Sequence, residues 1–344
     1  MFYPTRNVIL PPRLTGVDGA ARRVGVEIEF AGLSARDTAH LIAQHLGGEM
    51  QMVDEHRYDV VGGKLGPFRA ELDSRYVHPE GILGTLQDAP PDWLVQLSEL
   101  VSGTLGHAGA IVIPCEVVGP PVTVDQLPQI DDLIAHLRKA GAQGTDRSVF
   151  YAFGVHLNPE IATRDPAWLL SVLRAQCLMS PWLRTVMEID TSRYLTGFAA
   201  PFPQRYIDLI LQPGYAPDLD VLIADYVAHN PRRDRELDML PLFAWLDRDR
   251  IGKALPTEKI GARPTFHYRL PNAALERAAW SVVLEWNRWC LLERIAESPD
   301  LIRSLSEAYR HLPSPFDQAR WTRQSSEWLA HNFHLLAAHP NDGP

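Results

Sequence analysis

A short segment with strict alternation constrains this chain more than any other feature. Residues 22–30 read Arg-Arg-Val-Gly-Val-Glu-Ile-Glu-Phe, and a β-strand turns successive side chains to opposite faces. One face would hold the apolar residues Val24, Val26, Ile28 and Phe30. The other face would hold Gly25, Glu27 and Glu29. The apolar face must pack against a core. The presence of two acids on the second face needs a separate explanation.

Glu27 and Glu29 would lie about 6.6 Å apart at their Cα atoms, which is twice the rise of a strand. Like charges this close repel each other unless a cation or arginine side chains lie between them. Hard divalent cations such as Mg²⁺ prefer carboxylate oxygen, so one interpretation is a metal site. The alternative is an edge strand with a solvated acidic face, which is a common protection against aggregation.

Composition narrows the class of protein. The 344 residues are 46% hydrophobic and 22% charged, which suits one large globular domain or two smaller ones. A net charge of -9 argues against nucleic acid or an anionic membrane as the main partner. The three cysteines, at 115, 177 and 290, fit neither a disulfide framework nor a zinc motif. With no signal-peptide or membrane-spanning run, we expect a cytoplasmic protein.

Four later segments repeat the design of the first. They are a hairpin over residues 58–78, and alternating or largely apolar strands at 111–118, 151–158 and 264–271. Their polar positions are Glu71 and Asp73, Glu116, His156 and Asn158, and His267 and Arg269. A single acid in an apolar run needs a partner, and for Glu116 a core arginine is the alternative to a metal.

The remaining segments are mostly helical. We expect helices near residues 34–48, 92–107, 124–140, 167–177, 205–211, 219–229 and 236–247, and a long helix capped by Asn272. The predicted fold is α+β, with one antiparallel sheet that has a polar concave face and is backed by helices. We divide it into an irregular arm at 1–21, a catalytic domain at 22–272 and a C-terminal helical segment at 273–344 packed on the same domain.

Several acids around a divalent cation, with arginines for anionic oxygens, favour phosphoryl-transfer chemistry, in which the protein positions groups and neutralises charge. The chain contains no glycine-rich loop of the Walker type. A nucleotide would therefore be held by metal and side chains.

The ordered motifs resemble those of the amidoligases, which are relatives of glutamine synthetase and glutamate–cysteine ligase. They read Gly25-x-Glu27-x-Glu29, Glu71-x-Asp73-Ser74, Glu116-Val117-Val118-Gly119-Pro120-Pro121 and Gly154-Val155-His156-Leu157-Asn158. Residues 192–194 and 230–240 also look familial, and the resemblance spans roughly residues 22–272. It implies a carboxylate–amine ligase, in which ATP phosphorylates a carboxylate and an amine attacks the acyl phosphate.

The resemblance also implies roles for individual residues. Metal ligands would be Glu27, Glu29 and Glu116, together with His267 at the position of a family glutamate. ATP would be bound by His156, Asn158, Arg193 and Arg269. The substrate end would include Glu71, Asp73 and Ser74, and catalysis would depend on Arg193, Arg269 and Asp73. The implied cofactors are ATP and Mg²⁺, with Mn²⁺ as the alternative. The partners would be small-molecule or peptide carboxylates and amines, without nucleic acid or membrane, and the oligomeric state is open.

The chain departs from the family pattern at two positions. The second histidine of the family's Gly-x-His-x-His motif is Asn158 here, which still offers a donor and an acceptor. The glutamate of its Glu-Phe-Arg motif is His267 here. The imidazole could tune the site for Mn²⁺ or another substrate. It could instead mark a degenerate site, or be a bystander bonded to a carboxylate such as Glu71.

Three functions are therefore open. The first is an ATP- and Mg²⁺-dependent ligase, the second is a catalytically silent binding protein with the same cavity, and the third is a metal hydrolase that uses no nucleotide. A ligase should be stabilised against heat by ATP with Mg²⁺, whereas a hydrolase should respond to metal alone.

The two arginines generate a first prediction. Lysine cannot reproduce the planar fork of donors that arginine offers to phosphate, so Arg269→Lys and Arg193→Lys should lower activity strongly. Melting temperature and turnover, measured together, test this. An unchanged melting temperature with a large fall in activity supports phosphate binding. A collapse in stability supports a structural salt bridge instead.

Overall fold

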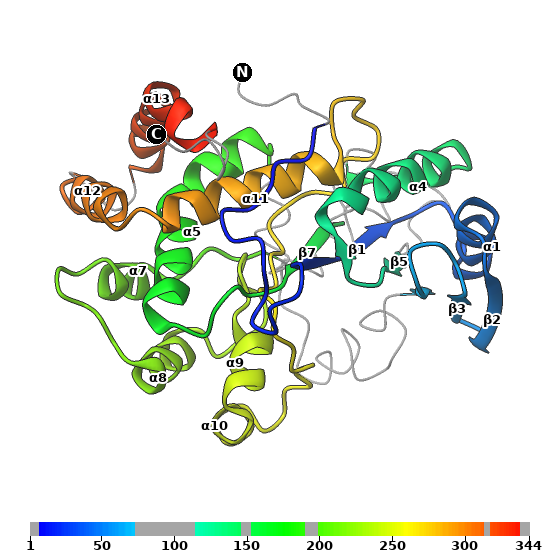
Figure 1. Cartoon of the computed structure of the whole chain (residues 1–344), viewed down its shortest axis with the longest axis horizontal. Coiled ribbons are helices and arrows are strands. Elements are labelled where there is room, and N and C mark those ends of the chain that lie inside the picture. Colours follow the sequence, from blue (N-terminus) through cyan, green and yellow to red (C-terminus); the bar gives the residue numbers. More distant parts are fainter. Residues whose placement is uncertain (1–6, 73–113, 146–152, 190–198, 313–316, 338–344) are drawn as a thin grey trace, which may run out of the picture.

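The computed structural model describes residues 7–72, 114–145, 153–189, 199–312 and 317–337 (Figure 1). The predicted helix at 92–107 and residues 111–113 of a predicted strand lie outside these ranges. So do three predicted site residues, Asp73, Ser74 and Arg193.

Within the described ranges, seven strands form one antiparallel sheet, as the alternation predicts. The strand order begins with β2 (Glu49–Asp54), β3 (Arg57–Val61), β4 (Phe68–Leu72), β5 (Cys115–Val118) and β1 (Arg23–Phe30). The short β6 (Val122–Thr123) pairs with the start of β1, and β7 (Val155–Pro159) pairs with its other edge. The opening segment of the sequence analysis is therefore a central strand, and the edge-strand alternative for it is wrong.

Residues 264–271 extend the sheet beyond β7 without forming a regular strand. Leu157 and Tyr268 exchange two backbone hydrogen bonds of 2.9 and 2.8 Å. Pro264 and Pro271 flank the segment and lack an N–H group, which limits the ladder to isolated bridges. On the far side, Asp238 N donates to His267 O at 2.9 Å, so residues 236–238 run beside this segment in turn.

The helices cover the apolar face of the sheet and continue the core beyond it (Figure 1). In chain order they are α1 (Ala35–Leu46), α4 (Leu127–Lys139), α5 (Pro166–Val186), α7 (Gln204–Ile210), α8 (Leu219–His229), α9 (Leu240–Leu246), α10 (Arg248–Ala254), α11 (Val282–Ala296), α12 (Pro299–Arg310) and α13 (Gln318–Ala337). α1 packs on β3 and β4. The indole of Trp289 on α11 packs on Phe266 and Tyr268, with ring centroids 5.1 and 5.3 Å apart.

Helix starts follow side-chain caps that the sequence offers. The side chains of Ser34, Asp165, Asp218 and Ser281 each accept a hydrogen bond from a backbone N–H in the first turn of their helix. Such a bond satisfies one of the donors that a helix leaves unpaired at its start.

Two predicted helix starts are wrong. The long helix begins at Val282 with Ser281 as its cap, and the Asn272 amide instead donates to the backbone of Met187 and Glu188 at 3.4 and 3.2 Å. The helix predicted from residue 236 covers only residues 240–246. Residues 236–238 are extended because Glu236 and Asp238 are both buried and find their partners on the neighbouring segments. The strand β2 was not predicted.

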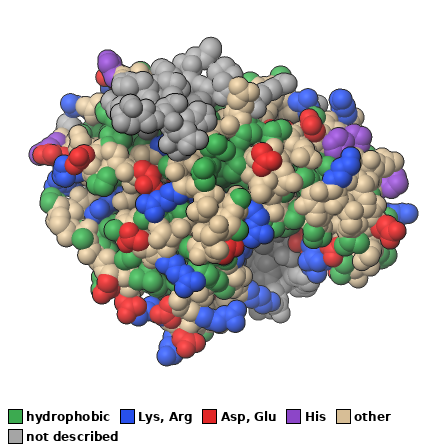
Figure 2. Space-filling view, in the orientation of Figure 1, with side chains coloured by type: hydrophobic (Ala, Val, Ile, Leu, Met, Phe, Trp, Pro, Cys, Tyr) green, Lys and Arg blue, Asp and Glu red, His purple; other side chains and the backbone are tan. Residues whose placement is uncertain are grey.

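The visible surface mixes acidic and basic side chains over the described residues (Figure 2). None of the helices within the described ranges is long and apolar enough to cross a bilayer.

A buried ion pair ties α11 to the start of the central strand. The Arg22 guanidinium donates to both carboxylate oxygens of Glu293, at 2.7 and 2.5 Å, and the two side chains are 1% and 0% exposed. Trp289 Nε1 also donates to Glu293 at 2.7 Å. The bidentate geometry offsets the cost of removing both charges from water.

Removing one member of this pair should lower the free energy of unfolding strongly. Glu293→Gln leaves the Arg22 charge buried without a counter-charge, and we expect a loss of about 3–5 kcal/mol in the free energy of unfolding. Urea denaturation measures this. Asp300→Asn, which breaks an ion pair with both side chains more than two-thirds exposed, is the control and should change little. Equal effects of the two substitutions would contradict the assignment.

Candidate active site

The strand register brings the predicted polar residues onto one face of the sheet. In the β1–β7 pair, Glu27 lies opposite His156 and Gly25 opposite Asn158. In the β1–β5 pair, Glu29 lies opposite Glu116, and Glu71 of β4 lies on the other side of Glu116. Residues that face each other across antiparallel strands point to the same side, so these side chains form a continuous polar surface.

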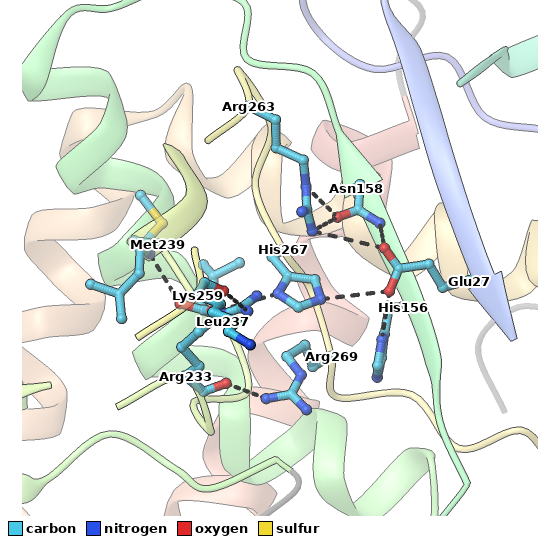
Figure 3. A network of polar contacts seen from close by, with 12 residues as sticks. Glu27, His156, Asn158, Arg233, Leu237, Met239, Lys259, Arg263, His267 and Arg269 are labelled. Carbon is cyan, nitrogen blue, oxygen red and sulfur yellow. Dashed lines mark hydrogen bonds and ion pairs between the residues drawn. The ribbon is translucent and has the colours of Figure 1, made fainter. Parts of the chain in front are cut away.

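Glu27 contacts polar side chains from several segments (Figure 3). Its Oε2 atom lies 3.0 Å from His156 Nδ1, and its Oε1 atom accepts from Asn158 Nδ2 at 2.9 Å. Arg263 Nη2 lies 3.8 Å from Oε1 and donates to Asn158 Oδ1 at 2.7 Å. Burial alone would raise the pKa of Glu27, but the His156 hydrogen bond and the nearby positive charges outweigh it and lower that pKa. Glu27 is therefore a carboxylate at neutral pH.

Gly25 makes room for this arrangement. A Cβ atom at Gly25 would lie 3.3 Å from the Cβ of Asn158, which is tighter than most contacts in proteins. The glycine of the alternating segment thus lets the amide of Asn158 reach Glu27.

Glu29 lies deeper, with 3% of its surface exposed. Its Oε2 atom accepts from the backbone N–H of Gly154 at 3.0 Å, and its Oε1 atom lies 4.0 Å from His156 Nε2. Glu29, Glu116 and His156 bring their ligand atoms within 4.8 Å of one another, and so do Glu27, His156 and His267. His156 therefore belongs to two clusters, one on each side of its ring.

His267 joins the sheet surface from the extended segment beyond β7. Its Nδ1 atom lies 3.3 Å from Asp238 Oδ2, its Nε2 atom lies 3.9 Å from Glu27 Oε2, and its ring meets that of His156 edge to face at 5.3 Å. Burial lowers the pKa of His267 well below its usual range, so the ring is neutral at pH 7. Its carboxylate neighbours are Asp238 and Glu27, so the carboxylate of the bystander alternative is Asp238 and not Glu71.

The donor sets of both clusters fit a divalent cation. Ligands at about 2.1 Å from one ion can be separated by up to about 4.2 Å. Glu27 Oε2 lies 3.0 Å from His156 Nδ1 and 3.9 Å from His267 Nε2, which is within this limit. Glu29 and Glu116 supply the carboxylate oxygens that Mg²⁺ prefers, whereas two imidazoles beside Glu27 also suit softer ions.

Arg269 lies at the border of this network. Its guanidinium donates to the backbone oxygen of Arg233, and Figure 3 shows it beside His267. Only 6% of its surface is exposed. At the other border, Arg57 Nε donates to Glu71 at 2.6 Å.

Three residues of the network carry no role in the sequence analysis: Asp238, Arg233 and Arg263. Arg233 Nε donates to Asp238 Oδ2 at 3.3 Å. Burial raises the pKa of Asp238, and the charges of Arg233 and Arg269 counteract part of that rise. The alternation of Glu236, Leu237 and Asp238 could have predicted an extended segment with its acids on one side. Arg263 has no comparable signal in the sequence.

Comparison with known families agrees with this geometry. A family model described as "Putative amidoligase enzyme" matches residues 20–291, which is most of the chain. The chain belongs to the amidoligase family. The match begins just before β1 and ends within α11, so it includes every described residue of the two clusters. Membership of this amidoligase family indicates a ligase-type enzyme. No curated protein matches the chain at a significant level.

The bond from Asn158 to Glu27 can be tested by substitution. Asn158→Leu keeps the volume but removes the donor, which leaves one oxygen of the partly buried Glu27 carboxylate without this hydrogen bond. We expect a loss of about 1–3 kcal/mol in the free energy of unfolding. Asn158→His restores a ring N–H donor and should cost less. Chemical denaturation of both variants provides the measurement, and equal losses would show that packing, not the hydrogen bond, is what matters at this position.

Proposed function

We propose that this amidoligase is an ATP-dependent carboxylate–amine ligase that forms an amide bond through an acyl phosphate. The observation that carries the proposal is the pair of acid and histidine clusters that share His156, on a sheet face that lies within the family match. Two of the three residues in each cluster are buried, and fixed charges act strongly on a transferring phosphoryl group in such surroundings.

The residues divide into three roles in this proposal. Glu27, Glu29, Glu116 and His267 would hold divalent ions, Mg²⁺ or Mn²⁺. His156, Asn158, Arg193 and Arg269 would bind the nucleotide phosphates, with the two arginines neutralising charge during transfer. Glu71, Asp73 and Ser74 would face the carboxylate substrate, and Asp73 would act in catalysis. Bound ions would bridge phosphate oxygens and neutralise the charge that develops on them.

The substrates would be small-molecule or peptide carboxylates and amines. Neither nucleic acid nor membrane is part of this proposal, since the net charge of -9 attracts neither. The three cysteine thiols are free and buried, which suits a reducing cytoplasm.

A metal hydrolase is the second candidate, because the same carboxylates could activate water without a nucleotide. A silent binding protein is the third. Thermal stability separates them. A ligase should gain stability from ATP with Mg²⁺ beyond the gain from either alone, a hydrolase should gain from metal alone, and a silent nucleotide-binding protein should gain without releasing ADP.

Turnover provides the decisive test. Glu27→Gln removes a charge that both histidines face, so ADP release over a panel of carboxylates and amines should fall below detection while the fold is kept. Glu49→Gln changes an exposed acid on the edge strand β2 of the same sheet and is the matched control. Full ATP turnover by the Glu27→Gln variant would contradict the proposed metal role of Glu27.

A further inference from the structure

Asp238 holds the His267 ring from the side opposite Glu27. The Asp238 side chain is completely buried, and its Oδ2 atom lies 3.3 Å from His267 Nδ1. An ionised carboxylate accepts hydrogen bonds and donates none. The hydrogen of this contact therefore belongs to His267 Nδ1, and a ring with a single N–H group then has its lone pair at Nε2.

The lone pair on Nε2 faces a second acceptor. Glu27 Oε2 lies 3.9 Å away, which is too long for a hydrogen bond. Among the described residues, the buried Nε2 atom makes no hydrogen bond. Two acceptors that face each other repel, and a cation between them would remove that repulsion. An ion at about 2.1 Å from each would span up to about 4.2 Å, which accommodates this separation.

Asp238 is itself held firmly in place. Its Oδ1 atom accepts from Leu240 N at 3.0 Å at the start of α9, and Arg233 Nε donates to Oδ2. Its own N–H donates to the backbone oxygen of His267 at 2.9 Å, so backbone and side chain fix the same pair of residues. A carboxylate that accepts from a ligating histidine sets the tautomer and makes the imidazole a more basic ligand.

We propose that Asp238 is a positioning residue that fixes His267 as the Nδ1–H tautomer, so that Nε2 of His267 and Glu27 form a mixed nitrogen and oxygen site for a borderline divalent ion. Mn²⁺, Co²⁺ and Zn²⁺ accept imidazole ligands more readily than Mg²⁺ does. The site should therefore favour Mn²⁺ over Mg²⁺. This inference rests on the proposed function, because it assigns the ion preference of the same site.

Asp238→Asn reverses the polarity of the contact with little change in shape. The amide oxygen can still accept from Leu240, which turns the amide N–H toward His267 Nδ1. The ring should then take the Nε2–H tautomer and donate to Glu27, leaving no lone pair for an ion. We expect long-range ¹H–¹⁵N NMR to report Nδ1–H in the native protein and Nε2–H in the variant. Affinity for Mn²⁺, measured by EPR without nucleotide, should fall about 10- to 100-fold.

Two controls separate positioning from a general structural effect. Asp247→Asn makes the same change at another aspartate that accepts a backbone N–H at a helix start, and it should leave Mn²⁺ affinity unchanged. In the His267→Glu background no tautomer exists to be fixed, so adding Asp238→Asn should have almost no further effect on Mn²⁺ affinity.

A measurement on the native protein covers the case in which Asp238→Asn does not fold. Titration with diamagnetic Zn²⁺ should shift the Nε2 resonance of His267 far more than its Nδ1 resonance. The proposal is overturned if native His267 is Nε2–H, if Zn²⁺ leaves Nε2 unshifted, or if Asp238→Asn keeps native Mn²⁺ affinity. All of these measurements are made without ATP. A failure of the ligase reaction would appear as absent ADP release with the tautomer and Mn²⁺ binding as expected.

Discussion

Partial burial of an ionised carboxylate at the centre of the sheet, with only 18% of the Glu27 side chain exposed, is the constraint on which this structure depends. An isolated carboxylate there would cost several kcal/mol and would take up a proton. Glu27 keeps its charge because His156 and Asn158 of β7 form hydrogen bonds with it and because Arg263 lies close to it from a third segment. Every one of these partners is distant in sequence, so the charge is stable only when the strands have the correct register.

The opposite face of β1 is apolar and fully packed, and it supports the charged face. Val24, Val26, Ile28 and Phe30 are all at most 3% exposed, and the helices α1, α4 and α11 extend that layer. Because a shift of one residue would exchange the two faces of β1, the apolar core and the acidic clusters select the same register. The ion pair of Arg22 with Glu293 fixes the start of that strand to α11.

Alternation in the sequence predicts which face each side chain takes, and this was correct for β1, β4, β5, β7 and residues 264–271. It does not predict which neighbours a buried polar residue will meet. Asp238 illustrates the limit. The sequence pattern places Asp238 in a helix, among Leu and Met residues. Its burial instead depends on contacts with His267 and Arg233, and only the folded chain brings these residues together. Arg263 carries no periodic signal at all, and the edge strand β2 lacks a buried face because all of its residues are exposed.

The position of His156 between two groups of acids has a consequence for the metal roles that we propose for them. A neutral imidazole has one lone pair and can be a ligand to one ion at a time. An ion that recruits this ring on the Glu29 side deprives the Glu27 side of a ligand, and the reverse holds equally. Under the proposed metal roles, occupancy of the two positions would be thermodynamically linked, with the same magnitude in both directions. The orientation of this single side chain would then influence the order in which the two positions are filled.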